Sequence, residues 1–183
     1  MRIEQTPLQD CFIVHEKVHG DARGYFIETF NQRDFNAASG LDILFVQDNQ
    51  SRSSKGVLRG LHMQRGASAQ AKLVRVLEGS VLDIAVDLRK GSPSFGQHFA
   101  IELTADNHKQ FFVPAGFAHG FVVLSEAATF FYKVDKFYEP GNEVGIMYND
   151  SSLNIDWKLA DSEIILSEKD KTLGSFAAYA ASL

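Results

Sequence analysis

One short segment of the sequence groups side chains that could move protons. Residues 58–64 contain Arg59 and His62, and Lys72 follows in the next apolar run. Histidine titrates near pH ~6.5, so a neutral imidazole is available as a base at cellular pH. Cations beside such a base suit a reaction that passes through an anionic intermediate. The segment therefore indicates proton transfer at His62, and the alternative for an isolated histidine is a hydrogen-bonded residue of the core.

A second segment, residues 113–120, carries a Pro-x-Gly turn that delivers His119 at the start of an expected strand. Asp83 lies opposite the apolar stripe of its own expected strand, and a buried aspartate needs a partner, for which His119 is the candidate. Tyr132 shares a strand face with Phe130. Its phenol is protonated at pH 7 and can donate a proton, but a core aromatic residue with a tied hydroxyl fits the pattern equally well.

A metal site is the competing explanation for these histidines. A metal site in a barrel usually takes two histidines two residues apart, with a third histidine and an acid. The residue two after His62 is Gln64, and the position near Lys72 offers a cation where an acid is needed. His119 alone is not a metal site. We therefore expect no metal and no other cofactor.

Strand alternation raises a difficulty for the first segment. Gly60, His62 and Gln64 share one face of a regular strand, and Arg59 does not. A β-bulge or a wide cavity at Gly60 would let Arg59 and His62 reach one ligand. Without it, Arg59 is a surface charge.

Short strands separated by clusters of Gly, Asn, Asp and Ser must position these residues. In residues 81–88, Leu82, Ile84, Val86 and Leu88 fall on one face. The expected strands are Cys11–His15, Tyr25–Phe30, Ile43–Asp48, Gly56–Gln64, Lys72–Glu78, Ser80–Leu88, Gln97–Leu103, Gln110–Val113, His119–Leu124 and Ala128–Val134. This spacing predicts an all-β fold, an antiparallel sandwich or barrel of the jelly-roll kind.

The remaining elements are few. Only Asn31–Ser39 and Gly174–Ala181 look helical, and the chain after about Asn149 is expected to pack over the barrel as loops and short helices. Residues 21–26 could form an ordinary hairpin and residues 47–49 a turn. Ser167 could cap a short helix. We expect one domain over residues 1–183.

Composition limits the partners. The net charge of -5 argues against broad affinity for nucleic acid, although a few cations can still dominate a cleft that binds a phosphate-bearing ligand. Cys11 is the only cysteine, so no intrachain disulfide can form, and its apolar neighbours indicate a buried thiol. The first ten residues lack the apolar core of a signal peptide, and no run is long enough to span a membrane. A cytoplasmic protein is the expectation.

Taken together, these residues resemble the dTDP-4-dehydrorhamnose 3,5-epimerases of the cupin superfamily. The combination of Leu58–His62 with Pro114–Phe121 is highly specific. The resemblance extends over nearly the whole chain, and it also covers Asp21–Glu28, Phe45–Ser51, Val57–Val74, Asp83–Arg89, Ser92–Gly96, Tyr132–Lys133, Tyr138–Gly145, Trp157 and Ser167–Asp170. It implies a cupin jelly-roll β-barrel with a few short peripheral helices.

The resemblance also implies a reaction. The substrate would be dTDP-4-dehydro-6-deoxy-D-glucose, inverted at C3 and C5 without a metal to give the L-rhamnose precursor. His62 resembles the base, Asp170 the carboxylate that supports its imidazolium, and Tyr132 the acid on the opposite face of the sugar. Lys72 resembles the cation beside the enolate oxygen. His119, held by Asp83, resembles a neighbouring sugar-binding group.

Other positions resemble those that bind the nucleotide. Arg23, Arg59 and Lys169 resemble diphosphate or sugar-nucleotide contacts. Glu28, Gln47 and Asn49 resemble polar contacts to the deoxythymidine end, and Tyr138 a ring stacked on thymine with Glu143 close by. Phe26 and Asp48 also match substrate-binding positions. The family is a homodimer in which the N-terminal segment completes the partner's barrel. The resemblance therefore implies that Arg23 and Glu28 serve the neighbouring subunit.

Three alternatives remain at this stage. An epimerase of a related dTDP sugar could invert only C3 or only C5, because the same base and acid serve both. A metal-dependent cupin dioxygenase or isomerase is disfavoured by Gln64. A non-catalytic binding module is disfavoured by the retention of both His62 and Tyr132.

Overall fold

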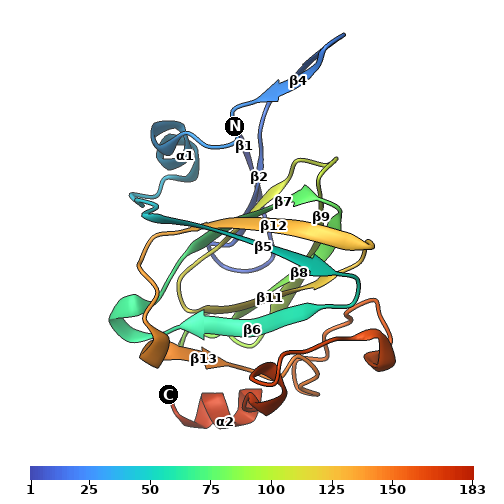
Figure 1. Ribbon diagram of the computed structural model, residues 1–183. Helices are drawn as coiled ribbons and strands as arrows, with labels where there is room; N and C mark the ends of the chain where they lie inside the picture. The colour runs from blue at the N-terminus through green and yellow to red at the C-terminus, as the bar shows by residue number, and fades with distance from the viewer.

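Two antiparallel sheets face each other in the computed structural model, which describes all of residues 1–183 (Figure 1). Every strand pair is antiparallel, which confirms the predicted all-β fold. The first sheet has the order β1 (Arg2–Gln5), β2 (Phe12–His15), β10 (Gln110–Val113), β7 (Lys72–Glu78), β12 (Ala127–Val134) and β5 (Gln47–Ser54). The second has the order β13 (Glu143–Gly145), β6 (Leu58–Gln64), β11 (Phe117–Val123), β8 (Ser80–Asp87) and β9 (His98–Thr104).

The main core lies between the sheets. Val74 and Phe130 of the six-stranded sheet pack in one cluster with Ala85, Phe117 and Phe121 of the five-stranded sheet. Burying these apolar surfaces supplies most of the driving force for closing one sheet on the other. The two sheets therefore form opposite walls of whatever space remains between them.

The outer face of each sheet is covered as well. Trp157 and Leu153, from the chain after β13, pack on the outer face of the five-stranded sheet against Leu82, Ile84 and Val86 of β8. Strand β8 therefore has its predicted alternation, and all but its first residue are buried, because both faces of the strand are covered. The expectation that the C-terminal stretch packs over the barrel as loops and short helices is confirmed.

A short helix covers the other sheet. Helix α1 (Gln32–Ser39) starts at Asn31, whose side chain accepts a hydrogen bond from the Asp34 amide, and ends at Gly40 in the left-handed conformation. Its Phe35 fills a cluster on the outer face of the six-stranded sheet. Helix α2 (Phe176–Ala181) begins two residues later than predicted. None of the helices combines the length and apolar character needed to cross a membrane.

The prediction at residues 43–48 was wrong. Residues 41–46 form no strand, and Ile43 and Phe45 pack as loop residues over the outer cluster. The strand is β5, which begins at Gln47, so the turn suggested for residues 47–49 is also wrong. This strand is polar on both faces, because its inward residues meet a cavity, and apolar alternation could not reveal it. Strands β1 and β13 were not among the expected strands, because neither short segment shows apolar alternation.

The hairpin suggested for residues 21–26 is confirmed. Strand β3 (Val18–Asp21) pairs with β4 (Gly24–Ile27), which ends three residues earlier than the expected strand at Tyr25–Phe30. The hairpin projects away from the two sheets (Figure 1). Tyr25 and Phe26 on it are 62% and 69% exposed.

Candidate functional site

A cavity of about 560 Å³ opens between the two sheets. Its walls come from both sheets, and a C-terminal segment closes one side. The five-stranded sheet contributes Arg59 and His62 of β6 and His119 and Phe121 of β11 to one wall. The six-stranded sheet contributes Asn49 and Ser51 of β5, Lys72 of β7, and Phe130 and Tyr132 of β12 to the opposite wall. The C-terminal segment contributes residues 165–167, Lys169 and Asp170. His62 and Tyr132 therefore lie on opposite walls of one cavity.

His62 and Asp170 form a hydrogen-bonded pair. Their Nε2 and Oδ1 atoms are 2.6 Å apart, and the carboxylate is almost fully buried. Burial lowers the pKa of His62, and the Asp170 charge opposes that shift. Asp170 opens a 3-10 turn whose N-cap residue is Lys169 and not Ser167 as expected, and no side chain caps the turn. The Asp170 amide nevertheless donates to the Ser167 hydroxyl at 3.2 Å, which fixes the start of the turn. The imidazole is thus held neutral and oriented, which is the state a general base needs.

His119 and Asp83 form a second pair, as the sequence predicted. His119 Nε2 lies 2.8 Å from Asp83 Oδ1, and both side chains are buried. The other carboxylate oxygen, Asp83 Oδ2, is buried without a hydrogen-bond partner. A half-satisfied buried carboxylate costs free energy, which is more typical of a functional site than of a structural one.

The difficulty of strand alternation at Arg59 is resolved by a bulge. His119 of β11 pairs with His62 of β6, and Phe121 pairs with Arg59. The paired residues are two positions apart on β11 but three apart on β6, so β6 contains one extra residue, a β-bulge. The extra residue brings Arg59 and His62 to the same cavity. Gly60 has φ 137°, and a Cβ there would lie 2.5 Å from the Gly120 Cα. Glycine is required at this position by both conformation and space.

Lys72 and Tyr132 lie on the wall facing the histidines. Burial lowers the pKa of Lys72 to about 8, and the Asp83 charge opposes this shift. Burial raises the pKa of Tyr132, and the Arg59 charge opposes it. The phenol therefore stays protonated at pH 7, and the ammonium is within reach of deprotonation.

The nucleotide positions suggested by the resemblance fall into two groups. Gln47, Asn49 and Tyr138 line a smaller cavity of about 300 Å³ that shares Asn49 and Tyr132 with the main one. Lys169 forms an ion pair with Glu143, which also accepts a hydrogen bond of 3.1 Å from the Tyr138 hydroxyl.

Four of the suggested positions lie outside these cavities in one chain. Arg23 and Phe26 are on the projecting hairpin and Glu28 follows it, bonded to Asn31 at 3.4 Å. Asp48 points outward from β5 and pairs with Lys133 at 2.9 Å.

Several residues of the cavity were not foreseen from the sequence. Ser51 would have followed from the alternation of Gln47 and Asn49 if β5 had been located correctly. Ile165 and Leu166 come from an irregular segment whose pattern carries no signal. Gln64, weighed as a metal ligand, instead accepts a hydrogen bond from the Glu139 amide at 3.0 Å. No group of three or more His, Cys, Asp or Glu side chains is arranged to hold a metal.

Comparison with known proteins supports the resemblance seen in the sequence. The family model of dTDP-4-dehydrorhamnose 3,5-epimerase matches residues 5–178. The dTDP-4-dehydrorhamnose 3,5-epimerase of Pseudomonas aeruginosa is 51% identical over 177 residues, 97% of each chain.

Solved structures agree with this match. The dTDP-4-dehydrorhamnose 3,5-epimerase of Elizabethkingia anophelis superposes with a TM-score of 0.94 at 54% identity, covering 97% of each chain. The dTDP-6-deoxy-D-glucose-3,5-epimerase of Legionella pneumophila, solved with dTDP-4-keto-L-rhamnose, has a TM-score of 0.91 at 46% identity, over 95% of this chain and 92% of that one. A 3'-monoepimerase from Streptomyces bikiniensis, solved with dTDP-quinovose, is only 29% identical over 100% of this chain and 90% of its own, with a TM-score of 0.90. The chain therefore belongs to the dTDP-4-dehydrorhamnose 3,5-epimerase family.

Proposed function

We propose that this chain inverts C3 and C5 of dTDP-4-dehydro-6-deoxy-D-glucose to give dTDP-4-dehydro-L-rhamnose. One observation carries the proposal: the His62–Asp170 pair and Tyr132 lie on opposite walls of one cavity, which is large enough for a sugar. Epimerisation needs a base on one face of the sugar ring and an acid on the other. Higher identity to 3,5-epimerases than to the mono-epimerase favours action at both carbons.

The first step is removal of a proton beside the ketone. The C4 carbonyl acidifies the protons at C3 and C5, because the resulting carbanion is delocalised as an enolate. The Asp170 carboxylate can only accept, so His62 Nε2 carries the hydrogen and Nδ1 keeps a free lone pair for the substrate proton. Asp170 then stabilises the imidazolium that forms.

The enolate oxygen is stabilised from the cavity walls. Lys72 supplies a positive charge there, and His119, oriented by Asp83, lies on the opposite sheet. One preorganised donor of this kind is typically worth about 3–4 kcal/mol of transition-state stabilisation.

The second step returns a proton from the other face. Tyr132 is the proposed donor, because burial raises its pKa and keeps the phenol protonated. A proton removed from one face and returned to the other inverts the carbon. Repeating the cycle at the second carbon completes the double epimerisation, and no step requires a metal.

The nucleotide occupies the rest of the cavity in this proposal. Arg59 and Lys169 bind the diphosphate, where charge-assisted hydrogen bonds to phosphate are strong. Gln47 and Asn49 line the adjoining space for deoxythymidine, and Tyr138 offers a ring for stacking on thymine, with Glu143 beside it.

The active form in this proposal is a homodimer. The hairpin with Arg23 and Phe26 projects beyond its own chain with exposed aromatic rings, and Glu28 follows it. These residues cannot serve the cavity of their own chain, and reaching the partner's cavity would bury them. Disruption of the dimer should therefore weaken dTDP binding.

Deuterium exchange tests the proposed reaction. The wild-type protein, incubated with dTDP-4-dehydro-6-deoxy-D-glucose in D₂O, should give a product labelled at both C3 and C5 by NMR. His62→Ala should lower exchange by about 10²–10⁴-fold and leave dTDP binding largely intact. Label at one carbon only would make the chain a mono-epimerase. Exchange in His62→Ala at a near-normal rate would show that His62 is not the base. Dialysis against a chelator should leave the wild-type rate unchanged.

A further inference from the structure

Arg59 lines the cavity, and most of the hydrogen-bonding capacity of its guanidinium is free. Its Nε donates to the Ser53 hydroxyl at 3.2 Å, and neither Nη atom has a protein partner within hydrogen-bond or ion-pair distance. A cavity-lining arginine whose two terminal nitrogens have no protein partner is suited to a dianionic ligand.

Ser53 is placed to fix that arginine. It lies on the inward face of β5, in line with Gln47, Asn49 and Ser51, and it is buried. Arg59 belongs to the opposite sheet, so this hydrogen bond crosses from one cavity wall to the other. The hydroxyl accepts at Nε alone and leaves both Nη atoms free for a ligand.

We propose that Ser53 is a positioning residue that holds the Arg59 fork toward the diphosphate of the nucleotide sugar. The inference rests on the proposed function for the ligand class, and it adds a residue that does not itself line the cavity. The bulge at Gly60 turns Arg59 inward, and the Ser53 hydroxyl then restricts its rotation. An arginine side chain has many rotamers to lose on binding, so fixing it before the ligand arrives lowers the cost of binding.

The strand provides a matched control. Ser54 is the next residue of β5, on the opposite, exposed face, and its side chain makes no hydrogen bond. Ser53→Ala and Ser54→Ala therefore remove the same hydroxyl from adjacent positions with different surroundings.

Calorimetric titration with dTDP tests the proposal. Ser53→Ala should weaken dTDP binding about five- to tenfold, and Ser54→Ala should bind as the wild type does. Ser53→Thr, which keeps a hydroxyl, should recover most of the affinity. In steady-state assays, Ser53→Ala should raise KM with little change in kcat, whereas general damage to the fold would lower kcat as well.

A double-mutant cycle shows whether Ser53 acts through Arg59. In an Arg59→Ala background, Ser53→Ala should cause no further loss of dTDP affinity. An equal loss in both backgrounds, or no loss in the wild-type background, would overturn the proposal. If Ser53→Ala does not fold, Arg59→Lys keeps the charge but lacks the planar fork, and wild-type affinity in that variant would also overturn it. Failure of the wild-type protein to bind dTDP would instead count against the proposed function.

Discussion

Two aspartates on the same face of strand β8 have opposite environments. Asp83 and Asp87 are four residues apart, and both are 0% exposed. Asp87 has all of its hydrogen-bonding capacity engaged, whereas Asp83 has one oxygen without a partner. One strand thus carries a fully hydrogen-bonded carboxylate at its end and an incompletely hydrogen-bonded one at its centre.

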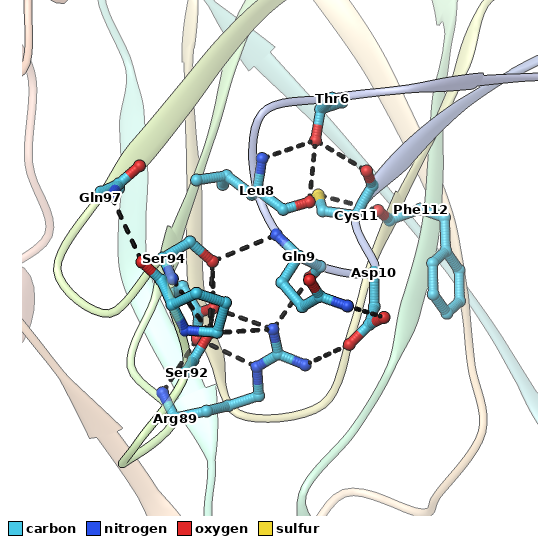
Figure 2. A network of polar contacts seen from close by, with 12 residues as sticks. Thr6, Leu8, Gln9, Asp10, Cys11, Arg89, Ser92, Ser94, Gln97 and Phe112 are labelled. Carbon is cyan, nitrogen blue, oxygen red and sulfur yellow. Dashed lines mark hydrogen bonds and ion pairs between the residues drawn. The ribbon is translucent and has the colours of Figure 1, made fainter.

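Figure 2 shows how Arg89 joins the N-terminal loop, at Gln9 and Asp10, to the barrel. Asp87 is the carboxylate at the centre of this network, which we call the Asp87 network. Asp87 accepts hydrogen bonds from Arg89, Ser92 and Ser94 at 2.5–3.0 Å, and Arg89 also binds Asp10 at 2.8 Å. Burial alone would raise the pKa of Asp87, but these hydrogen bonds outweigh it and lower the pKa to about 2. The Arg89 guanidinium also lies 4.8 Å from the centre of the Phe117 ring, two residues before His119.

Asp83 has a single hydrogen bond, to His119, and lies beneath the cavity. A satisfied network stabilises and rigidifies, while an incompletely satisfied carboxylate keeps an electrostatic field that a reaction can use. Asp83 and Asp87 are equally buried, so burial of a charge alone does not identify a site. The number of partners the charge retains is the better indicator.

The largest expected effect is on stability at Asp87. Asp87→Asn removes the charge that compensates Arg89 and breaks the network, so the free energy of unfolding should fall by about 3 kcal/mol. Urea denaturation measures this loss. The folded fraction should keep kcat within about twofold of wild type, and a large loss of kcat would mean that the network is part of the catalytic machinery.

Asp83→Asn should have the opposite effect, with a large loss of kcat and little loss of stability. The amide can still accept from His119, but the negative charge is lost, so kcat should fall by about 10²-fold, or ~2.7 kcal/mol. The free energy of unfolding should change by less than about 1 kcal/mol, because the amide keeps the hydrogen bond from His119 while the costly buried charge is removed. Equal destabilisation by Asp83→Asn and Asp87→Asn would remove the distinction between the two aspartates.

Acid should remove the stability that the Asp87 network contributes. The folded-state pKa of about 2 is below the usual value of 3.8, so the network contributes stability above pH 4 and loses it as the pH falls toward 2. This loss should amount to about 2 kcal/mol. Unfolding titrations at pH 2–5 should show a smaller acid dependence in Asp87→Asn, and an unchanged dependence would contradict the assignment.

The last and smallest change concerns how kcat/KM falls at alkaline pH. Lys72 has a pKa lowered to about 8, so the positive charge beside the enolate is present below that pH and lost above it. The kcat/KM profile of the wild type should therefore decline above about pH 8. Because the Asp83 charge raises the pKa of Lys72, Asp83→Asn should move this decline to lower pH. A decline that stays in place would show that Asp83 does not act on Lys72.

The apolar alternation of β8 was sufficient to predict which residues lie on which face of the strand. The His119–Asp83 pair followed from the same alternation. The parts that were missed lack such a signal: β5 is polar on its inward face, and residues 165–167 are irregular. The bulge at Gly60 was foreseeable from the conflict between Arg59 and His62. The three-dimensional approach of Ser53 to Arg59 could not be read from the sequence, because it depends on how two sheets diverge around a cavity.

The central claim is that His62 and Tyr132 act from opposite faces of one sugar. Tyr132→Phe, incubated with dTDP-4-dehydro-6-deoxy-D-glucose in D₂O, tests it most directly. This variant should still exchange substrate protons for deuterium, because His62 is intact, while inversion falls by at least about 10²-fold. If Tyr132→Phe kept both deuterium exchange and full inversion, Tyr132 would not be the acid opposite His62.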